Sequence, residues 1–281
     1  MKTLYDVPAP AKLNLFLHVI GRRADGYHQL QSAFALIDWC DRLHFDRRMN
    51  RGISREDLRT PLPENDLIVQ AAKALQSASG TSLGVHIGVE KSIPTQAGLG
   101  GGSSDAASTL LALNQLWDLR LPLSRLTEIG LGLGADVPFF LAGRNAWVEG
   151  IGELTTPLTL EIGTFLVVKP AAGLSSERIF SDALLKRDTA MAIIPGFAAN
   201  PRGFGCNDLQ AVAQRHCPGV LQALEWLAAQ GLNGRMTGSG SAVFAWAPCQ
   251  MALNSAPAGF DVRWCSGLDV HPLSGWACAM V

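Results

Sequence analysis

Hydrophobic and polar side chains alternate between Lys12 and Val19, and this pattern predicts a β-strand. Because successive side chains of a strand point to opposite faces, Lys12 and Asn14 project together on the face away from the leucines. A turn is predicted between Gly21 and His28, where the sequence contains Asp-Gly. The segment Leu43–Arg59 is polar and rich in arginine, with little periodicity, so it is predicted to be a solvated loop or hairpin.

Further along the chain, helical and strand patterns follow one another. Asn65 and Asp66 offer a helix N-cap before the apolar-periodic run that begins at Leu67, and Gly80 follows that run. Other helices are predicted over residues 104–117, 207–216 and 219–230, and other strands over residues 85–89, 164–169, 242–247 and 262–265. Glycine and proline cluster between residues 150 and 163, which indicates a domain boundary there.

The composition limits the class of protein. The 281 residues suit two domains or one large one, and 48% are hydrophobic while 17% are charged, so global disorder is excluded. A formal net charge of −1 argues against nucleic-acid binding. No apolar stretch reaches the roughly 18 residues of a membrane span, and the first residues do not resemble a signal peptide. The six cysteines form no C-x-x-C pair. A soluble, cytoplasmic protein is therefore predicted.

Glycine accounts for 29 residues, and many of them are concentrated in two segments. The first glycine segment, which begins at Pro94, leads into the helix predicted over residues 104–117. Glycine permits positive φ angles, and a helix start adds free amides and a positive dipole end, so this segment is expected to bind the phosphates of a nucleotide. A flexible turn capped by Ser104 or Asp105 is the alternative. The predicted nucleotide-binding residues are Pro94, Thr95, Gln96, Ala97, Gly98, Leu99, Gly100, Gly101, Gly102, Ser103 and Ser104.

Three common phosphate-binding motifs do not fit this segment. A Walker A loop requires a lysine after its glycines, which is missing here. A dinucleotide-binding fingerprint requires a third glycine where Ser103 stands, and it follows its strand directly. The glycine-rich loop of protein kinases covers a hairpin instead of opening a helix. The second glycine segment, Met236–Phe244, suggests a second backbone wall around the same ligand.

Taken together, these motifs resemble the GHMP small-molecule kinases. The family shares a lysine-bearing N-terminal strand, a P-x-x-x-G-L-G-G/S-S-S-x-A-A loop and a C-terminal glycine-rich loop, and all three occur here in order. Pro10–His28, Pro63–Leu67, Gly98–Ala107 and Gly134–Phe140 further resemble the branch that phosphorylates the 2-hydroxyl of a cytidine-diphosphate-linked methylerythritol in isoprenoid precursor synthesis. That branch usually has Pro-Met-Gly where this chain has Pro94-Thr95-Gln96.

The resemblance implies a fold, cofactors and partners. We expect an α+β protein with a ribosomal-protein-S5-like N-terminal domain over residues 1–155 and a ferredoxin-like C-terminal domain over residues 156–281. ATP and Mg²⁺ are the expected cofactors, and ATP and the cytidine-linked alcohol are the expected partners. Neither a nucleic acid nor a membrane is expected as a partner, and the sequence does not indicate the oligomeric state.

The resemblance also implies roles for individual residues. Asp136 corresponds to the base that accepts the proton of the attacking hydroxyl, and Lys12 to the catalytic lysine. The implied substrate-binding residues are Asn14, Tyr27, His28 and Phe180, of which the aromatic ones read the cytosine. Two alternatives remain open: another GHMP kinase acting on mevalonate or a sugar, and a catalytically inert nucleotide- or RNA-binding module.

Overall fold

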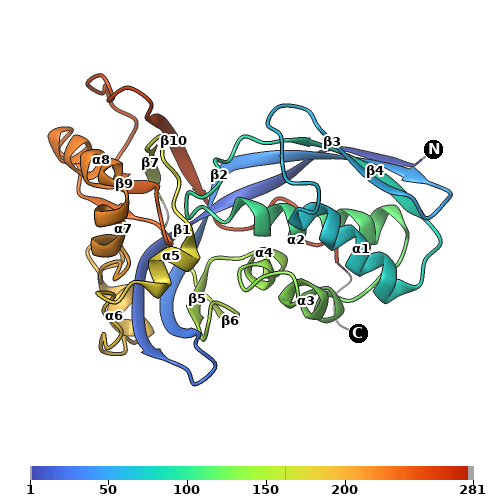
Figure 1. The fold of residues 1–281 in the computed structure, drawn as a ribbon, viewed down its shortest axis with the longest axis horizontal. Coiled ribbons are helices and arrows are strands. Elements are labelled where there is room, and N and C mark those ends of the chain that lie inside the picture. The colour runs from blue at the N-terminus through green and yellow to red at the C-terminus, as the bar shows by residue number, and fades with distance from the viewer. Residues whose placement is uncertain (1, 162, 278–281) are drawn as a thin grey trace.

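The two longest strands organise the whole molecule. The computed structural model describes residues 2–161 and 163–277. Strand β1 (Thr3–Arg22) and strand β2 (His28–Arg48) form a long antiparallel hairpin that runs through both halves of the chain (Figure 1). The turn predicted between Gly21 and His28 joins them, so this prediction is confirmed. The hairpin carries Lys12 and Asn14 from the same strand toward the centre of the molecule.

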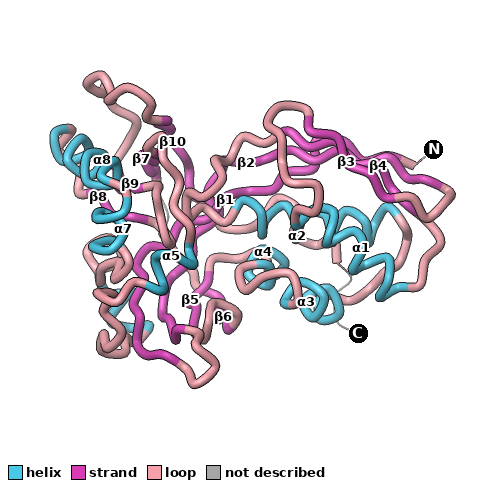
Figure 2. Tube along the Cα trace, viewed as in Figure 1, coloured by secondary structure: helices cyan, strands magenta, loops and turns pink. Residues whose placement is uncertain are grey.

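In the N-terminal half, helices cover one face of the sheet (Figure 2). The core between them is made by fully buried side chains such as Phe45, Leu110 and Phe139. The elements of this half are β3 (Ile53–Asp57), α1 (Leu67–Ser79), β4 (Gly84–Glu90), α2 (Gly101–Leu116), α3 (Leu123–Leu131), α4 (Val137–Ala142), β5 (Ala146–Glu149) and β6 (Leu154–Pro157). The opposite face carries polar side chains such as Arg42 and His44, which are at least partly exposed, as antiparallel sheets commonly do.

The C-terminal half extends the same sheet. Strand β10 pairs with β7 over most of its length and with β2 through Gly267 and Leu268, which gives the strand order β3-β4-β2-β10-β7-β9-β8. The elements of this half are β7 (Thr164–Lys169), α5 (Ser176–Ser181), α6 (Ile194–Ala199), α7 (Gln210–His216), α8 (Pro218–Ala229), β8 (Gly234–Met236), β9 (Val243–Ala247) and β10 (Asp261–Leu268). Mixed helices and antiparallel strands agree with the predicted α+β class.

Several helix and strand ends follow local signals that were predicted. The Asp66 carboxylate accepts a hydrogen bond of 3.1 Å from the amide of Val69, so it caps α1 as predicted. Gly80 ends this helix in the left-handed conformation, with φ of 68°. The strands predicted near residues 85–89, 164–169, 242–247 and 262–265 are confirmed as β4, β7, β9 and β10.

The start of α2 differs from the prediction. The helix begins at Gly101, three residues before the predicted start at Ser104. Gly100 is the N-cap residue and takes φ of 72°, and Gly101 and Gly102 already belong to the first turn of the helix. Low helix propensity hid this first turn in the sequence, because glycine is among the poorest helix formers.

The prediction for Leu43–Arg59 is wrong in part. Strand β2 continues to Arg48, and β3 then pairs in parallel with β4, so only residues 49–52 and 58–59 of the segment are loop. Leu43 and Phe45 are fully buried against the N-terminal core. Arg42, His44 and Asp46 alternate with these two residues and are at least partly exposed, and so many polar residues concealed the alternation of a strand.

The chain passes between the two halves more than once. Leu17 and Val19 of β1 pack in the core of the C-terminal half, and Leu273 returns to the core of the N-terminal half. The segment between β6 and β7 lies near the predicted division into residues 1–155 and 156–281, which stays a prediction. Among the helices of the described residues, none is both long and apolar enough to cross a membrane.

Candidate active site

A cavity of about 830 Å³ lies where β1, the start of α2 and the start of α4 meet the C-terminal half. Most of the predicted site residues line it, although they come from distant parts of the sequence. They are Lys12, Asn14, Pro94, Thr95, Gln96, Ala97, Gly98, Leu99, Gly100, Gly101, Gly102, Ser103, Asp136 and Phe180. Tyr27, His28 and Ser104 are not among the residues of the cavity wall.

The first glycine segment presents free backbone amides to this cavity. Gly98 and Gly100 have φ of 75° and 72°, which bend the chain sharply into α2. The amides at positions 101–103 make no hydrogen bond to any residue that the structure describes, because they belong to the first turn of the helix. The amide of Ser104 donates to the carbonyl of Gly100 at 2.9 Å, and its side chain is fully buried. The amides that are available to an anion are therefore those of residues 101–103.

The two glycine segments are in direct contact. A Cβ on Gly98 would lie 2.2 Å from the carbonyl oxygen of Thr237, and a Cβ on Gly238 would lie 2.8 Å from that of Gly98. The fully buried hydroxyl of Thr237 accepts a hydrogen bond of 2.9 Å from the amide of Asn14 and donates to the carbonyl of Gly98 at 3.3 Å. Thr237 thus connects β1, the first glycine segment and the second.

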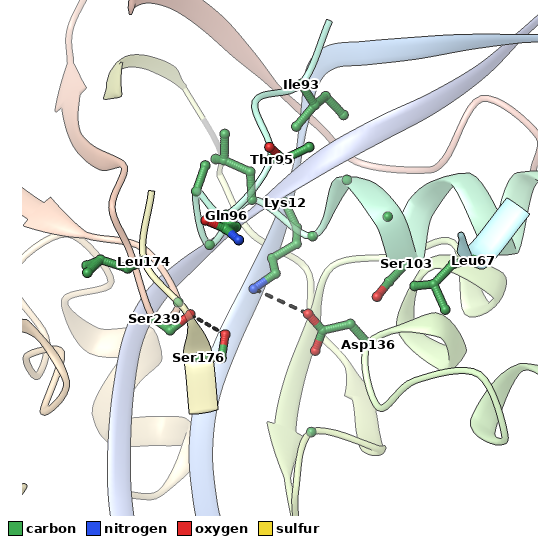
Figure 3. Close-up of a pocket in the computed structure, with 18 of the residues that line it drawn as sticks. Lys12, Leu67, Ile93, Thr95, Gln96, Ser103, Asp136, Leu174, Ser176 and Ser239 are labelled. Atoms are coloured by element: carbon green, nitrogen blue, oxygen red, sulfur yellow. Dashed lines mark hydrogen bonds and ion pairs between the residues drawn. The ribbon is translucent and has the colours of Figure 1, made fainter. Parts of the chain in front are cut away.

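Lys12 and Asp136 face each other across the cavity (Figure 3). The Lys12 Nζ lies 3.5 Å from Asp136 Oδ2, and it donates a hydrogen bond of 2.5 Å to Asn14 Oδ1. Burial lowers the pKa of Lys12, and the nearby carboxylate of Asp136 opposes this shift. Asp136 keeps 28% of its side-chain surface exposed at the N-cap of α4, so a hydroxyl group can reach it.

The position of the lysine is fixed by its neighbours. The amide of Lys12 donates to the carbonyl of Leu99 at 3.0 Å, which docks β1 against the first glycine segment. The Nζ lies 4.5 Å from the ring centroid of Phe34, on the strand next to it. Asn14 Nδ2 donates to Ser32 Oγ at 3.0 Å, so the amide group that receives the lysine is itself oriented.

Two of the predicted substrate-binding rings are in contact. The rings of His28 and Phe180 are stacked, with centroids 5.2 Å apart and planes inclined by 30°. Phe180 belongs to α5 and lines the cavity, whereas Tyr27 is 60% exposed in the turn between β1 and β2. Burial lowers the pKa of His28, and the neighbouring Arg187 and Arg22 lower it further.

Gln96 stands where the resemblance to the GHMP kinases implied a glycine. It adopts φ of 52°, a left-handed conformation that costs a residue with a side chain about 1–2 kcal/mol. Its carbonyl accepts hydrogen bonds from the amides of Leu174 at 3.2 Å and Ser241 at 3.3 Å. A Cβ on Gly173 would lie 2.7 Å from Gln96 Oε1, so the glutamine side chain occupies the space beside that glycine.

A buried ion network beneath the first glycine segment was not predicted. Lys91 Nζ donates to Asp41 and, at 2.7 Å, to Asp105 Oδ2. Burial alone would lower the pKa of Lys91, but the two carboxylates together raise it. Asp41 also accepts from the amides of Ser92 at 2.5 Å and Ile93 at 2.8 Å, so it anchors the strand end that leads into the glycines. Because Asp38 and Arg42 stand close to Asp41 in the sequence, no local pattern distinguished Asp41 from the other charged residues of β2.

Two further residues that sequence reasoning missed meet at the rim of the cavity. The hydroxyl oxygens of Ser176 and Ser239 are 2.6 Å apart, and Figure 3 shows the pair beside the lysine. This contact joins the start of α5 to the second glycine segment. The short polar side chains gave no pattern that distinguishes them from ordinary loop residues.

The oxygen atoms near Lys12 fit a magnesium ion that a nucleotide brings with it. Mg²⁺ keeps several waters and binds phosphates together with one or two protein oxygens. The Ser103 hydroxyl and the Asp136 carboxylate line the same part of the cavity (Figure 3). Within residues 2–161 and 163–277, no group of three or more His, Cys, Asp or Glu side chains could hold a metal ion by itself.

Known family models match both halves of the chain. The model of the GHMP kinases N-terminal domain matches residues 66–144, and the model of the GHMP kinases C-terminal domain matches residues 187–256. The first match contains the first glycine segment and Asp136. The second contains the glycine segment that begins at Met236.

Close relatives carry one common name. A protein of Albidiferax ferrireducens named 4-diphosphocytidyl-2-C-methyl-D-erythritol kinase is 69% identical over 277 residues, covering 99% of this chain and 96% of its own length. One of a Polaromonas species with the same name is 61% identical over 293 residues, covering 98% of this chain and 95% of its own length.

Solved structures agree with these relatives. The crystal structure of 4-(cytidine 5'-diphospho)-2C-methyl-D-erythritol kinase has a TM-score of 0.77 and 33% identity, covering 92% of this chain and 98% of its own. The homoserine kinase of Cytophaga hutchinsonii has a TM-score of 0.70 over 96% of each chain, but its 14% identity shows a shared fold alone.

Proposed function

This chain belongs to the GHMP kinase family, and we propose that it transfers the γ-phosphoryl group of ATP to the 2-hydroxyl of 4-diphosphocytidyl-2-C-methyl-D-erythritol. It is a small-molecule kinase that serves the methylerythritol phosphate route to isoprenoid precursors. The observation that carries the proposed chemistry is the contact of 3.5 Å between Lys12 and Asp136 in a cavity that also receives the N-terminus of α2. Close relatives that bear the substrate's name support the choice of alcohol.

The free amides of residues 101–103 bind the phosphate groups of ATP at the positive end of α2. The buried ammonium of Lys12 stabilises the negative charge on the transferred phosphoryl group, as a lysine point charge does in other phosphate sites. The Ser103 hydroxyl would hold a Mg²⁺ ion that accompanies the nucleotide, and the ion would supply further neutralisation of the phosphate charge. Phosphoryl transfer depends mainly on such positioning and charge stabilisation.

Asp136 receives the proton of the substrate. As the 2-hydroxyl oxygen forms its bond to the γ-phosphorus, its proton passes to the Asp136 carboxylate, and the bond between the γ-phosphorus and the bridging oxygen of ADP breaks. Lys12 keeps this carboxylate ionised, because a cation within about 4–6 Å favours the charged form. Asn14 orients the lysine through its own hydrogen bond of 2.5 Å.

The stacked pair of His28 and Phe180 binds the cytosine of the substrate, with Tyr27 on the exposed side. Flat rings beside a polar imidazole suit an unpaired base, which proteins commonly bind by stacking and by hydrogen bonds to its edge. Ser176 and Ser239 line the same cavity and are available to bind the diphosphate and the polyol of the substrate. A cytoplasmic location remains part of this proposal.

The alternatives from the sequence are less well supported. Mevalonate, homoserine and galactose kinases share the fold at sequence identities of 13%, 14% and 16%. Identities this low do not indicate that this chain phosphorylates the same alcohols. An inert nucleotide- or RNA-binding module would not require a lysine and a carboxylate held together in a cavity. The net charge of −1 also disfavours RNA.

The proposed function is tested by a coupled assay of ADP release. The purified protein is given ATP, Mg²⁺ and one alcohol at a time: the cytidine-diphosphate substrate, mevalonate, homoserine or galactose. We expect ADP release with the cytidine-diphosphate substrate and rates at background with the other three. Faster turnover of any other alcohol would contradict the proposal.

A further inference from the structure

One arginine ties the base-reading rings together. The Nε of Arg187 donates a hydrogen bond of 2.9 Å to His28 Nε2. Its Nη2 donates to the carbonyl oxygens of Phe180 at 3.2 Å and Asp182 at 2.8 Å, and its Nη1 donates to that of Leu185 at 3.0 Å. A single half-buried guanidinium therefore holds the imidazole at the start of β2 against the helix that carries the phenylalanine.

Arg187 makes these hydrogen bonds without taking part in an ion pair among the described residues. Among the described residues, no carboxylate lies within the 4 Å of a salt bridge to Arg187. The Asp182 side chain instead pairs with Arg215 at 3.1 Å and with His216 at 2.7 Å. Arg187 therefore acts through directed hydrogen bonds, one of which ends on a titratable ring.

The hydrogen bond to His28 determines where the ring carries its proton. A guanidinium only donates hydrogen bonds, so the Nε2 that receives it must be the unprotonated nitrogen. A neutral imidazole then carries its hydrogen on Nδ1. No described residue accepts a hydrogen bond from His28 Nδ1, which leaves this donor available to a ligand.

We propose that Arg187 is a positioning residue that holds His28 as the Nδ1–H tautomer, so that the ring offers a hydrogen-bond donor to the cytosine. This inference rests on the proposed function. The ring of cytosine presents acceptors at N3 and O2, whereas N3 of uracil carries a hydrogen. A fixed Nδ1–H donor therefore favours the cytidine nucleotide over the uridine nucleotide. Arg187 would thus select the substrate without touching its reactive end.

Two variants separate this role from a purely structural one. Arg187→Met keeps much of the side-chain volume and removes every donor, whereas Arg187→Lys keeps one donor and the charge. His28→Gln identifies the signals of the ring in the nuclear magnetic resonance spectrum. Long-range ¹H–¹⁵N correlations of ¹⁵N-histidine-labelled protein then report the tautomer without any substrate.

In the unsubstituted protein we expect the proton of His28 on Nδ1, and in Arg187→Met a shift to the Nε2–H form. Calorimetric titration with cytidine diphosphate and with uridine diphosphate, in the absence of ATP, gives the nucleotide preference. We expect the preference for the cytidine nucleotide to fall about tenfold in Arg187→Met, the factor expected when one hydrogen bond to a buried polar edge is lost. Arg187→Lys should recover part of that preference.

In kinetic assays, the KM for the cytidine-linked substrate should rise in Arg187→Met, while kcat and the KM for ATP stay near their original values. A proton on Nε2 in the unsubstituted protein would overturn the inference. So would equal losses of affinity for the cytidine and uridine nucleotides, which would indicate that Arg187 binds the diphosphate directly. The tautomer of His28 can be measured even if the protein phosphorylates none of the alcohols tested. The proposed kinase function and the proposed role of Arg187 are therefore tested independently.

Discussion

Thr237 joins β1 to both glycine segments, and its replacement by valine gives a sharp test. Valine has nearly the same shape but lacks the hydroxyl that accepts from the amide of Asn14 at 2.9 Å and donates to the carbonyl of Gly98 at 3.3 Å. Because Thr237 is fully buried, the Asn14 amide would have no replacement partner. Such a loss costs about 1–3 kcal/mol.

The same substitution should impair catalysis, because Asn14 orients Lys12 and the Gly98 carbonyl belongs to the loop that binds phosphate. We expect kcat to fall about tenfold, which corresponds to about 1.4 kcal/mol of transition-state stabilisation. Urea unfolding followed by tryptophan fluorescence gives the change in stability, and the ADP-release assay gives kcat and both KM values.

Thr237→Ser is the matched control. It keeps the hydroxyl and loses one buried methyl group, which costs about 0.8 kcal/mol. Its kcat should stay within about twofold of the original, since a change of that size corresponds to less than half a kcal/mol. The reasoning is refuted if Thr237→Val is as stable and active as the unsubstituted protein, or if the serine variant loses more activity than the valine variant.

Three further substitutions test other parts of the site and fold. Tyr27→Ala should weaken turnover of the cytidine-linked alcohol far more than ATP binding, and equal losses in the two would count against a role in base binding. Gly100→Ala should lower kcat at least tenfold, because the added Cβ, at φ of 72°, would lie 3.1 Å from Lys12 Cε. Gly102→Ala is the control and should be tolerated, because its added Cβ would make only an ordinary contact. Burial lowers the pKa of His271 from 6.5 to about 4. Below pH 6.5 the unfolded chain therefore binds a proton that the folded protein excludes. The free energy of unfolding should accordingly decline by about 3 kcal/mol between pH 7 and pH 4. His271→Gln should remove that part of the decline, and parallel pH profiles for the two proteins would contradict it.

The sequence was most informative where a local pattern and a chemical requirement coincide. The alternation around Lys12 and Asn14 predicted both a strand and a shared polar face, and the structure joins these two side chains by a hydrogen bond. The Asp66 cap and the left-handed Gly80 are local signals, because their partners lie within a few residues. Asp136 was found only through the resemblance, since an aspartate before a short helix is also typical of an ordinary cap.

Contacts between distant segments could not be read from one sequence. Lys91 bonds Asp41 fifty residues away, and Thr237 bonds Asn14 across more than two hundred. Strand β3 pairs in parallel with β4 only after a helix has intervened, and its charged residues masked the pattern. Residue identities give no register for such pairings, because tertiary packing decides them.

The distance between Lys12 and Asp136 underlies the whole proposal, and a single-turnover experiment with Asp136→Asn tests it most directly. Enzyme in excess over ATP is mixed rapidly with the cytidine-linked substrate, and the phosphorylated product is followed by quenched flow, while ATP affinity is measured separately by titration. The account predicts unchanged ATP affinity and a phosphoryl-transfer rate lower by about two to four orders of magnitude, the usual contribution of a general base. A transfer rate close to that of the unsubstituted enzyme would contradict the assignment of Asp136 as the proton acceptor.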